Sequence, residues 1–164
     1  MSANPVVILK DLKKSCGDCT VCCSGALSGE AHGHAFFKGR PCFFVTTKGC
    51  SIYEDRPETP CKSFKCGYLS ENFFPEYMRP DICGALTTMR VFKYTEKVMQ
   101  DDKEVEVEKF IPYMHVIDYK QTMDAATLMW FIEKYMINSI PNLLLDIKGG
   151  IRKVGRPDFM AKLP

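Results

Sequence analysis

Eight cysteines between residues 16 and 66 constrain this chain more than any other feature, and the ninth, Cys83, stands apart from them. The group opens with Cys-x-x-Cys-x-x-Cys-Cys, a spacing in which neighbouring thiolates can reach one ion, as they do in zinc and iron–sulfur sites. The sequence therefore predicts a metal site. Its predicted ligands are Cys16, Cys19, Cys22, Cys23, Cys42, Cys50, Cys61 and Cys66.

The adjacent pair Cys22-Cys23 indicates more than one centre. Adjacent side chains point in different directions in a helix and in a strand, so the two thiols are not expected to bind the same ion. Eight thiols suffice for two closed tetrahedral zinc sites. A four-iron cluster (4Fe-4S) with a zinc ion, or one cluster with spare thiols, satisfies the same count, because thiolate binds zinc and iron–sulfur clusters alike. Which cysteines share a centre stays open.

Three further residues are candidate ligands. Cys83 follows Pro80-Asp81-Ile82, and we interpret it as a buried core thiol rather than a ligand. His32 and His34 lie between groups of cysteines and either replace a thiol or serve as ordinary loop residues. His115, in an apolar segment, is expected to be a core or strand histidine whose hydrogen bonds are satisfied.

Composition limits the classes of protein to which the chain can belong. It has 164 residues, 46% of them hydrophobic, which is enough for one compact domain. We expect residues 1–85 to form a cysteine-cluster metal-binding module and residues 86–164 to form an α+β part packed against it. The net charge of +2 gives no reason to expect nucleic acid as a partner, and metal ions are the partners that the sequence indicates. No protein partner is indicated.

The expected location is the cytoplasm. The start of the chain lacks a long apolar segment and a cleavage site of small residues, and no apolar run is long enough to span a membrane. An odd number of cysteines in a reducing compartment argues against a disulfide framework and for metal ligation.

The predicted fold class is α+β, with an irregular, metal-stapled cysteine module packed on a small antiparallel sheet and one main helix. Residues 4–14 should form a short helix or strand. The helix is predicted over residues 122–139, where apolar residues recur at helical spacing after a capping Thr122 or Asp124. The aromatic run of residues 64–77 should pack the module against the rest of the chain.

Alternation of apolar and polar residues predicts the strands. Residues 86–94 are expected to form one strand, and residues 96–110 a hairpin with one solvated face that carries Glu104, Glu106 and Glu108. A second hairpin is expected over residues 143–154.

The cysteine-rich half resembles a known family. The opening cysteines, the segment Gly49-Cys50-Ser51-Ile52-Tyr53-Glu54-Asp55-Arg56-Pro57, and Cys61 with Phe64-x-Cys66 are similar to the CxxCxxCC family of cysteine-cluster proteins, described as zinc- or iron-chelating. The resemblance covers about residues 14–85. It implies that the eight cysteines are metal ligands, and it implies no activity. One relative, the flagellin lysine methylase, carries a similar cluster in a longer enzyme associated with iron–sulfur.

Three functional hypotheses follow, and whether the chain is an enzyme stays open. The first is a metal-binding protein whose zinc or iron is largely structural. The second is an iron–sulfur enzyme related to flagellin lysine methylase. The third is a zinc-ribbon-like adaptor for nucleic acid or protein, in which Phe43 and neighbouring aromatic and basic residues form a stacking surface. In each case Arg56, with Lys62 and Lys65, is expected to offset thiolate charge.

Overall fold

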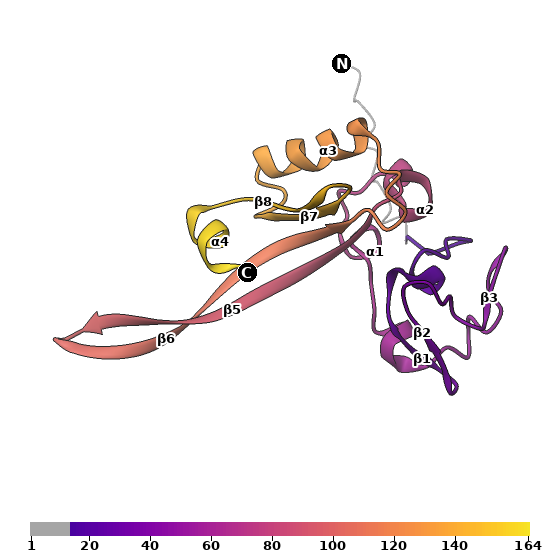
Figure 1. The fold of residues 1–164 in the computed structure, drawn as a ribbon, viewed down its shortest axis with the longest axis horizontal. Coiled ribbons are helices and arrows are strands. Elements are labelled where there is room, and N and C mark those ends of the chain that lie inside the picture. Colours follow the sequence, from indigo (N-terminus) through magenta and orange to yellow (C-terminus); the bar gives the residue numbers. More distant parts are fainter. Residues whose placement is uncertain (1–13) are drawn as a thin grey trace, which may run out of the picture.

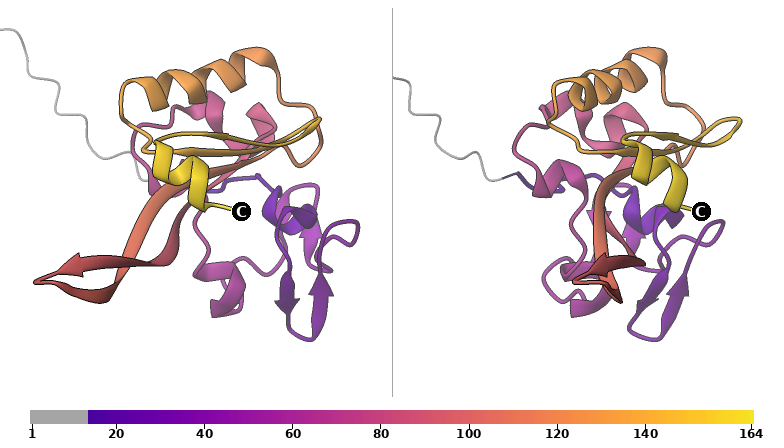
Figure 2. Two further views of the ribbon diagram at one scale, coloured as in Figure 1. Left: turned by 60° about the vertical axis from the view of Figure 1, so that its left-hand side comes forward. Right: turned by 90° about the vertical axis from the view of Figure 1, so that its left-hand side faces the viewer.

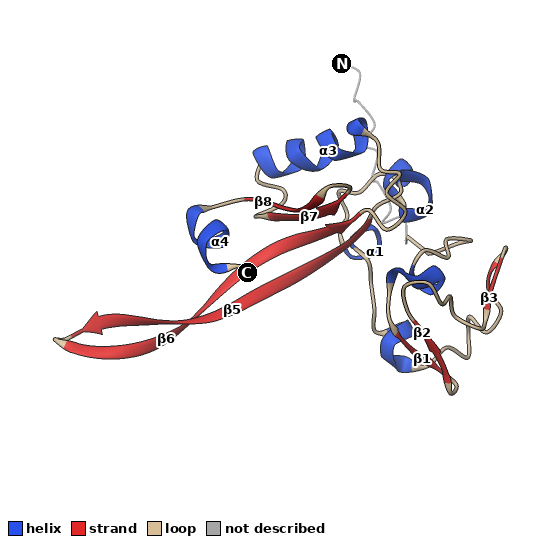
Figure 3. Ribbon diagram, in the orientation of Figure 1, coloured by secondary structure: helices blue, strands red, loops and turns tan. Residues whose placement is uncertain are grey.

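The computed structural model describes residues 14–164, so all but the last residue of the predicted segment 4–14 lies outside the described part. A loop-rich module lies at one end of the molecule and a long β-hairpin projects from the other (Figure 1; Figure 3). The elements are the helical turn η1 (Cys22–Ala26), β1 (Gly29–Ala31), β2 (His34–Phe36), β3 (Val45–Thr46), β4 (Gly49–Cys50), the helical turn η2 (Glu58–Lys62), α1 (Gly67–Ser70), the helical turn η3 (Glu76–Met78), α2 (Pro80–Cys83), β5 (Leu86–Gln100), β6 (Lys103–Ile117), α3 (Ala125–Met136), β7 (Leu143–Ile147), β8 (Gly150–Val154) and α4 (Pro157–Lys162).

Helices and strands both occur, with α3 as the main helix, as predicted for an α+β fold. The main sheet has the order β5-β6-β7-β8. Two of its pairings are antiparallel, but β6 and β7 run parallel, so the sheet is mixed rather than purely antiparallel. The reason is topological: α3 lies between β6 and β7 in the chain and returns it to the end from which β6 started.

Side-chain alternation gives the sheet two faces, and one helix covers each of them (Figure 1; Figure 2). Met114 and Val116 of β6 belong to the same buried cluster as Phe131 of α3. Ile111 and Tyr113, which alternate with them, belong to a second cluster with Phe159 of α4. The helix α4 was not predicted.

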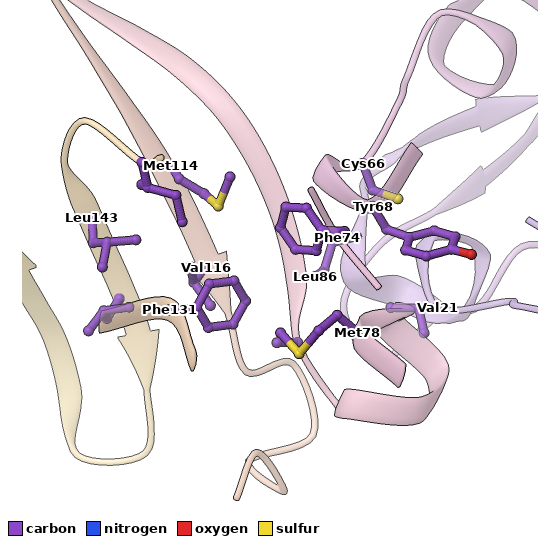
Figure 4. Packing of buried hydrophobic residues seen from close by; sticks show 13 residues of the cluster. Val21, Cys66, Tyr68, Phe74, Met78, Leu86, Met114, Val116, Phe131 and Leu143 are labelled. Carbon is purple, nitrogen blue, oxygen red and sulfur yellow. The ribbon is translucent and has the colours of Figure 1, made fainter. Parts of the chain in front are cut away.

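The main core joins the two halves of the sequence. Cys66, Tyr68 and Phe74 belong to one buried cluster with Leu86 and Phe131, whose members Figure 4 draws. The aromatic run of residues 64–77 thus contacts the sheet as predicted, although Tyr77 remains 59% exposed.

The main helix and both hairpins lie where the sequence predicts them. The helix α3 begins after Asp124, whose side chain accepts a hydrogen bond from the Thr127 backbone N–H at 2.7 Å. The strand predicted over residues 86–94 continues directly into the predicted hairpin, which gives two strands of 15 residues each. Asp101 and Asp102 form its turn, both with positive φ.

A buried asparagine fixes the sheet to the C-terminal helix. Asn142 is fully buried; its Nδ2 donates to the Pro112 carbonyl at 2.8 Å, and its Oδ1 accepts from the Arg156 backbone N–H at 2.9 Å. No helix within residues 14–164 has both the length and the apolar character needed to cross a membrane.

Candidate metal centre

The first two cysteines lie on a tight turn. The Cys19 backbone N–H donates to the Cys16 carbonyl at 2.9 Å, and Gly17 between them has a φ of 54°. That left-handed conformation suits glycine and allows the chain to turn within four residues. Val21 is then buried in the main core, which directs Cys22 into the protein.

Cys22 and three thiols near it form what we call the first thiol set. Burial raises the pKa of Cys22, and the negative charges of the nearby thiolates of Cys66, Cys19, Cys23 and Cys16 raise it further. Burial also raises the pKa of Cys19, to about 11, and that of Cys66. Cys23 is also near but is assigned to the second set described below. The members of the first thiol set are therefore Cys16, Cys19, Cys22 and Cys66.

Cys23 and the three remaining thiols form the second thiol set. Burial raises the pKa of Cys23 to about 12, with further contributions from Cys42, Cys50 and Cys61. The backbone explains part of this arrangement, since the Cys42 N–H donates to the Cys23 carbonyl at 2.7 Å. Burial, followed by Cys42 and Cys50, also raises the pKa of Cys61. The members are Cys23, Cys42, Cys50 and Cys61.

A small cavity lies among the thiols. It encloses about 80 Å³ and is lined by every cysteine of the two sets except Cys42. The side chains surrounding it are not arranged as a finished coordination sphere: within residues 14–164, no three Cys, His, Asp or Glu side chains stand at the geometry that would hold a metal ion. The described chain therefore shows two neighbourhoods of thiols around one cavity.

One arginine lies near each thiol set. The Arg56 guanidinium lowers the pKa of Cys23 and of Cys61, against the effect of burial. Its Nε donates to the Tyr53 carbonyl at 2.7 Å, and the guanidinium carbon lies 3.6 Å from the Tyr53 ring centroid, so Arg56 stacks on the tyrosine ring.

Arg79 lies on the side of the first thiol set. It lines the cavity and forms ion pairs with Asp81 at 2.7 Å, Asp18 at 3.0 Å and Glu76 at 3.3 Å. Asp81 in turn contacts the Cys19 thiol. The role of Arg79 was not predicted, because nothing in its local sequence shows that the chain folds back onto Asp18. Lys62 and Lys65, predicted beside the thiols, are exposed.

The remaining candidate ligands lie apart from both sets. Cys83 is half-buried, and its thiol donates to the carbonyls of Met78 and Ala85, as expected for a core thiol. His34 stacks on Phe43 with ring centroids 4.3 Å apart, and His32 bonds through Nε2 to the Asp55 carbonyl. His115 lies half-buried in the strand β6, but its Nδ1 has no hydrogen-bond partner in the described chain, so it is not the satisfied histidine expected.

A wider cavity of about 990 Å³ lies between α2 and α3. Two of its carboxylates already have partners, since Asp81 pairs with Arg79 and Asp124 caps α3. Among the described residues that line it, no histidine accompanies Cys83, so the thiol has no neighbouring base of that type.

Comparison with protein-family models, with curated proteins and with solved structures finds no match for this chain. The resemblance to the CxxCxxCC family therefore stays an expectation based on the residues quoted above, and the function is argued from the thiol sets.

Proposed function

We propose that the chain binds two metal ions, one in each thiol set, and that the metal is zinc with a largely structural role. The observation that carries the proposal is that seven of the eight cysteines line one cavity, and that Cys22 and Cys23 each lie near three further thiols. Four thiolates complete a tetrahedral zinc site with no open position, which is the arrangement of structural rather than catalytic zinc.

Charge supports the same reading. A zinc ion with four thiolate ligands carries a net charge of about −2, which a nearby cation offsets. Arg56 acts on Cys23 and Cys61 of the second thiol set, and Arg79 lies beside the first. Raised thiol pKa values oppose the thiolate form in the absence of metal, so ligation and proton release would occur together.

The structural role follows from the composition of the module. The strands β1 to β4 have two or three residues each, and the cluster that packs beside them, apart from the main core, has three buried residues, Ala31, Phe36 and Cys42. So small a core gives little stability by itself, and metal ligation would supply the rest.

The deciding measurement is elemental analysis of protein purified without oxygen. We expect two zinc ions per chain and neither iron nor labile sulfide. Detection of iron and sulfide would indicate an iron–sulfur cluster instead of zinc. That result would favour the hypothesis of an enzyme related to flagellin lysine methylase. Protein that retains no metal and takes up none would refute metal binding.

Removal of the metal tests the structural role separately. Chelation should alter the far-ultraviolet circular dichroism and lower the temperature of thermal unfolding, while readdition of zinc should restore both. A metal-bound protein whose dichroism and unfolding temperature do not respond to chelation would contradict a structural role.

A second candidate function is the adaptor. Phe43 is 70% exposed, and its ring is nearly parallel to that of His34, with an angle of 11° between them. No acidic residue occurs between Ala31 and Tyr53, whereas Lys38, Arg40 and Lys48 do. Such a surface suits bases that stack beside a phosphate backbone. Retention of a single-stranded oligonucleotide at low salt, lost in Phe43→Ala, would support it; no retention would reject it.

A further inference from the structure

The wider cavity between α2 and α3, which we call the α2–α3 groove, is lined by apolar side chains that are not buried. Figure 1 shows α2 near the end at which α3 begins. The groove encloses about 990 Å³, and Tyr77, Ile82 and Met129 along it are 59%, 54% and 61% exposed. Exposed apolar side chains that gather in one hollow indicate a binding surface for another chain segment.

The groove is also acidic. Three carboxylates line it, those of Asp81, Asp124 and Glu133, whereas Lys120 is the one basic residue of the described chain that does so. Asp81 pairs with Arg79 and Asp124 caps α3, but Glu133 forms no ion pair with any residue from 14 to 164. An occupant that carries apolar side chains and positive charge would therefore match this groove.

The sequence that precedes the described part has this character. Residues 6–9 are a continuous apolar run, Val-Val-Ile-Leu, and Leu12 follows it. The charged side chains of residues 1–13 are Lys10, Lys13 and Asp11, which give this segment a net positive charge. Thirteen residues span up to about 43 Å when fully extended, which is ample for reaching a neighbouring groove.

The described chain begins near one wall of the groove. The Lys14 Nζ donates to the Glu71 carbonyl at 2.6 Å and lies 5.1 Å from the centroid of the Tyr68 ring. The Tyr68 hydroxyl in turn donates to the Glu76 carboxylate, and Glu76 directly precedes Tyr77 of the groove. Residues 1–13 are therefore attached to the molecule beside the groove that matches their composition.

We propose that residues 6–12 of the same chain bind in the α2–α3 groove. Their apolar side chains contact Tyr77, Ile82 and Met129, and their lysines offset the unpaired charge of Glu133. Attachment through Lys14 strengthens the contact, because a short tether keeps a segment at an effective concentration of about 1 mM near its site. A weak contact is then sufficient to keep the groove occupied.

Trp130 can report whether the groove is occupied, because it lines the groove and is the one tryptophan in the sequence. Leu9→Asp in the intact protein should release the segment. The emission of Trp130 should then shift to longer wavelength, and its quenching by acrylamide, an uncharged quencher, should increase. The matched control is Ser2→Asp, which adds the same charge outside the apolar run and should leave both quantities unchanged.

Cleavage by trypsin after Lys10 tests the groove side of the contact. The initial rate should follow the fraction of molecules in which the segment is released. Met129→Asp should raise this rate by about tenfold, because it removes one apolar contact and leaves the cleaved sequence intact. The matched control is Met136→Asp, which is also on α3 and is 69% exposed but does not line the groove, and it should leave the rate unchanged.

Three results would overturn the proposal. In the first, Leu9→Asp and Ser2→Asp have the same Trp130 emission and quenching, which would leave the groove to a separate partner. In the second, Met129→Asp and Met136→Asp are cleaved at equal rates. In the third, protection from trypsin grows with protein concentration, which would mean that the segment binds in the groove of a second copy. Circular dichroism identical to that of the unchanged protein establishes that each variant is folded.

Discussion

Cys22 and Cys23 are consecutive in the chain, yet their thiols lie in different groups: Cys22 lies beside Cys66 and Cys19, and Cys23 beside Cys42 and Cys50. One peptide bond thus joins the two proposed metal centres. Serine substitutions can test each centre alone, because serine keeps the size of the side chain and removes the thiolate.

Each serine variant should lose one specific ion. Cys22→Ser and Cys16→Ser should retain one zinc per chain, held by the second thiol set, and Cys23→Ser and Cys61→Ser should retain one, held by the first. Zinc per chain, measured after gel filtration, checks this. Cys83→Ser is the matched control and should retain both ions, because its thiol bonds only to backbone carbonyls. Retention of two ions by any of the four ligand variants would contradict the assignment.

Arg79→Gln should lower the free energy of unfolding by about 1 kcal/mol, because it removes the positive charge shared by three carboxylates on a side chain that is only 19% exposed. Arg79→Lys keeps the charge but loses the bidentate hydrogen bond to Asp81. Its free energy of unfolding should lie between those of the unchanged protein and Arg79→Gln.

The matched control for Arg79 is Arg156→Gln, which breaks a single ion pair with Asp158 at a side chain that is 60% exposed. It should change the free energy of unfolding by about 0.3 kcal/mol. Denaturant unfolding measures all three variants. An effect of Arg79→Gln no larger than that of Arg156→Gln would show that the three-carboxylate network does not stabilise the fold.

Asn142→Ala should cost about 2–3 kcal/mol of unfolding free energy, since it removes both hydrogen bonds of a fully buried side chain, those with the Pro112 carbonyl and the Arg156 N–H. Asn72→Ala, at an exposed position, should have almost no effect. Chemical denaturation provides the comparison, and a cost of less than about 0.5 kcal/mol for Asn142→Ala would mean that the clamp between β6 and α4 is dispensable.

His115 should make the protein less stable in mild acid. Burial, and then the positive charge of Arg90, lower the pKa of His115 below its ordinary value of 6.5, and its Nδ1 is buried without a hydrogen-bond partner in the described chain. The unfolded state therefore binds a proton before the folded state does, so stability is full above pH 6.5 and declines as the pH falls through the lowered pKa. His115→Gln should decline less over that range in thermal unfolding scans. Equal declines in the two proteins would exclude His115 as the cause.

Local patterns were sufficient to predict much of the fold. The recurrence of apolar residues about every 3.6 positions predicted α3. Of the two caps expected for this helix, Thr122 and Asp124, the structure has Asp124. Alternation identified both hairpins, and Glu104, Glu106 and Glu108 do share one face. These features depend on neighbours within a few residues, which a sequence displays directly.

Features that depend on distant parts of the chain were not predicted. The parallel pairing of β6 with β7 is determined by how α3 crosses the sheet, and α4 is a six-residue helix whose burial depends on Ile111 and Tyr113. The adjacency of Cys22 and Cys23 predicts two metal centres, and that stays a prediction. That Cys66 joins the first thiol set and Cys61 the second depends on the path of residues 57–68 and is visible only in the structure.

The β5–β6 hairpin also has a consequence for the order of folding. Its 15 cross-strand pairs close around a turn at Asp101 and Asp102, so most of the ladder grows one neighbour at a time from a small loop. The thiol sets, in contrast, bring together residues as far apart as Cys16 and Cys66, which requires closure of a long chain segment first. The hairpin should therefore acquire protection against hydrogen exchange early in refolding, and the cysteine-rich module late.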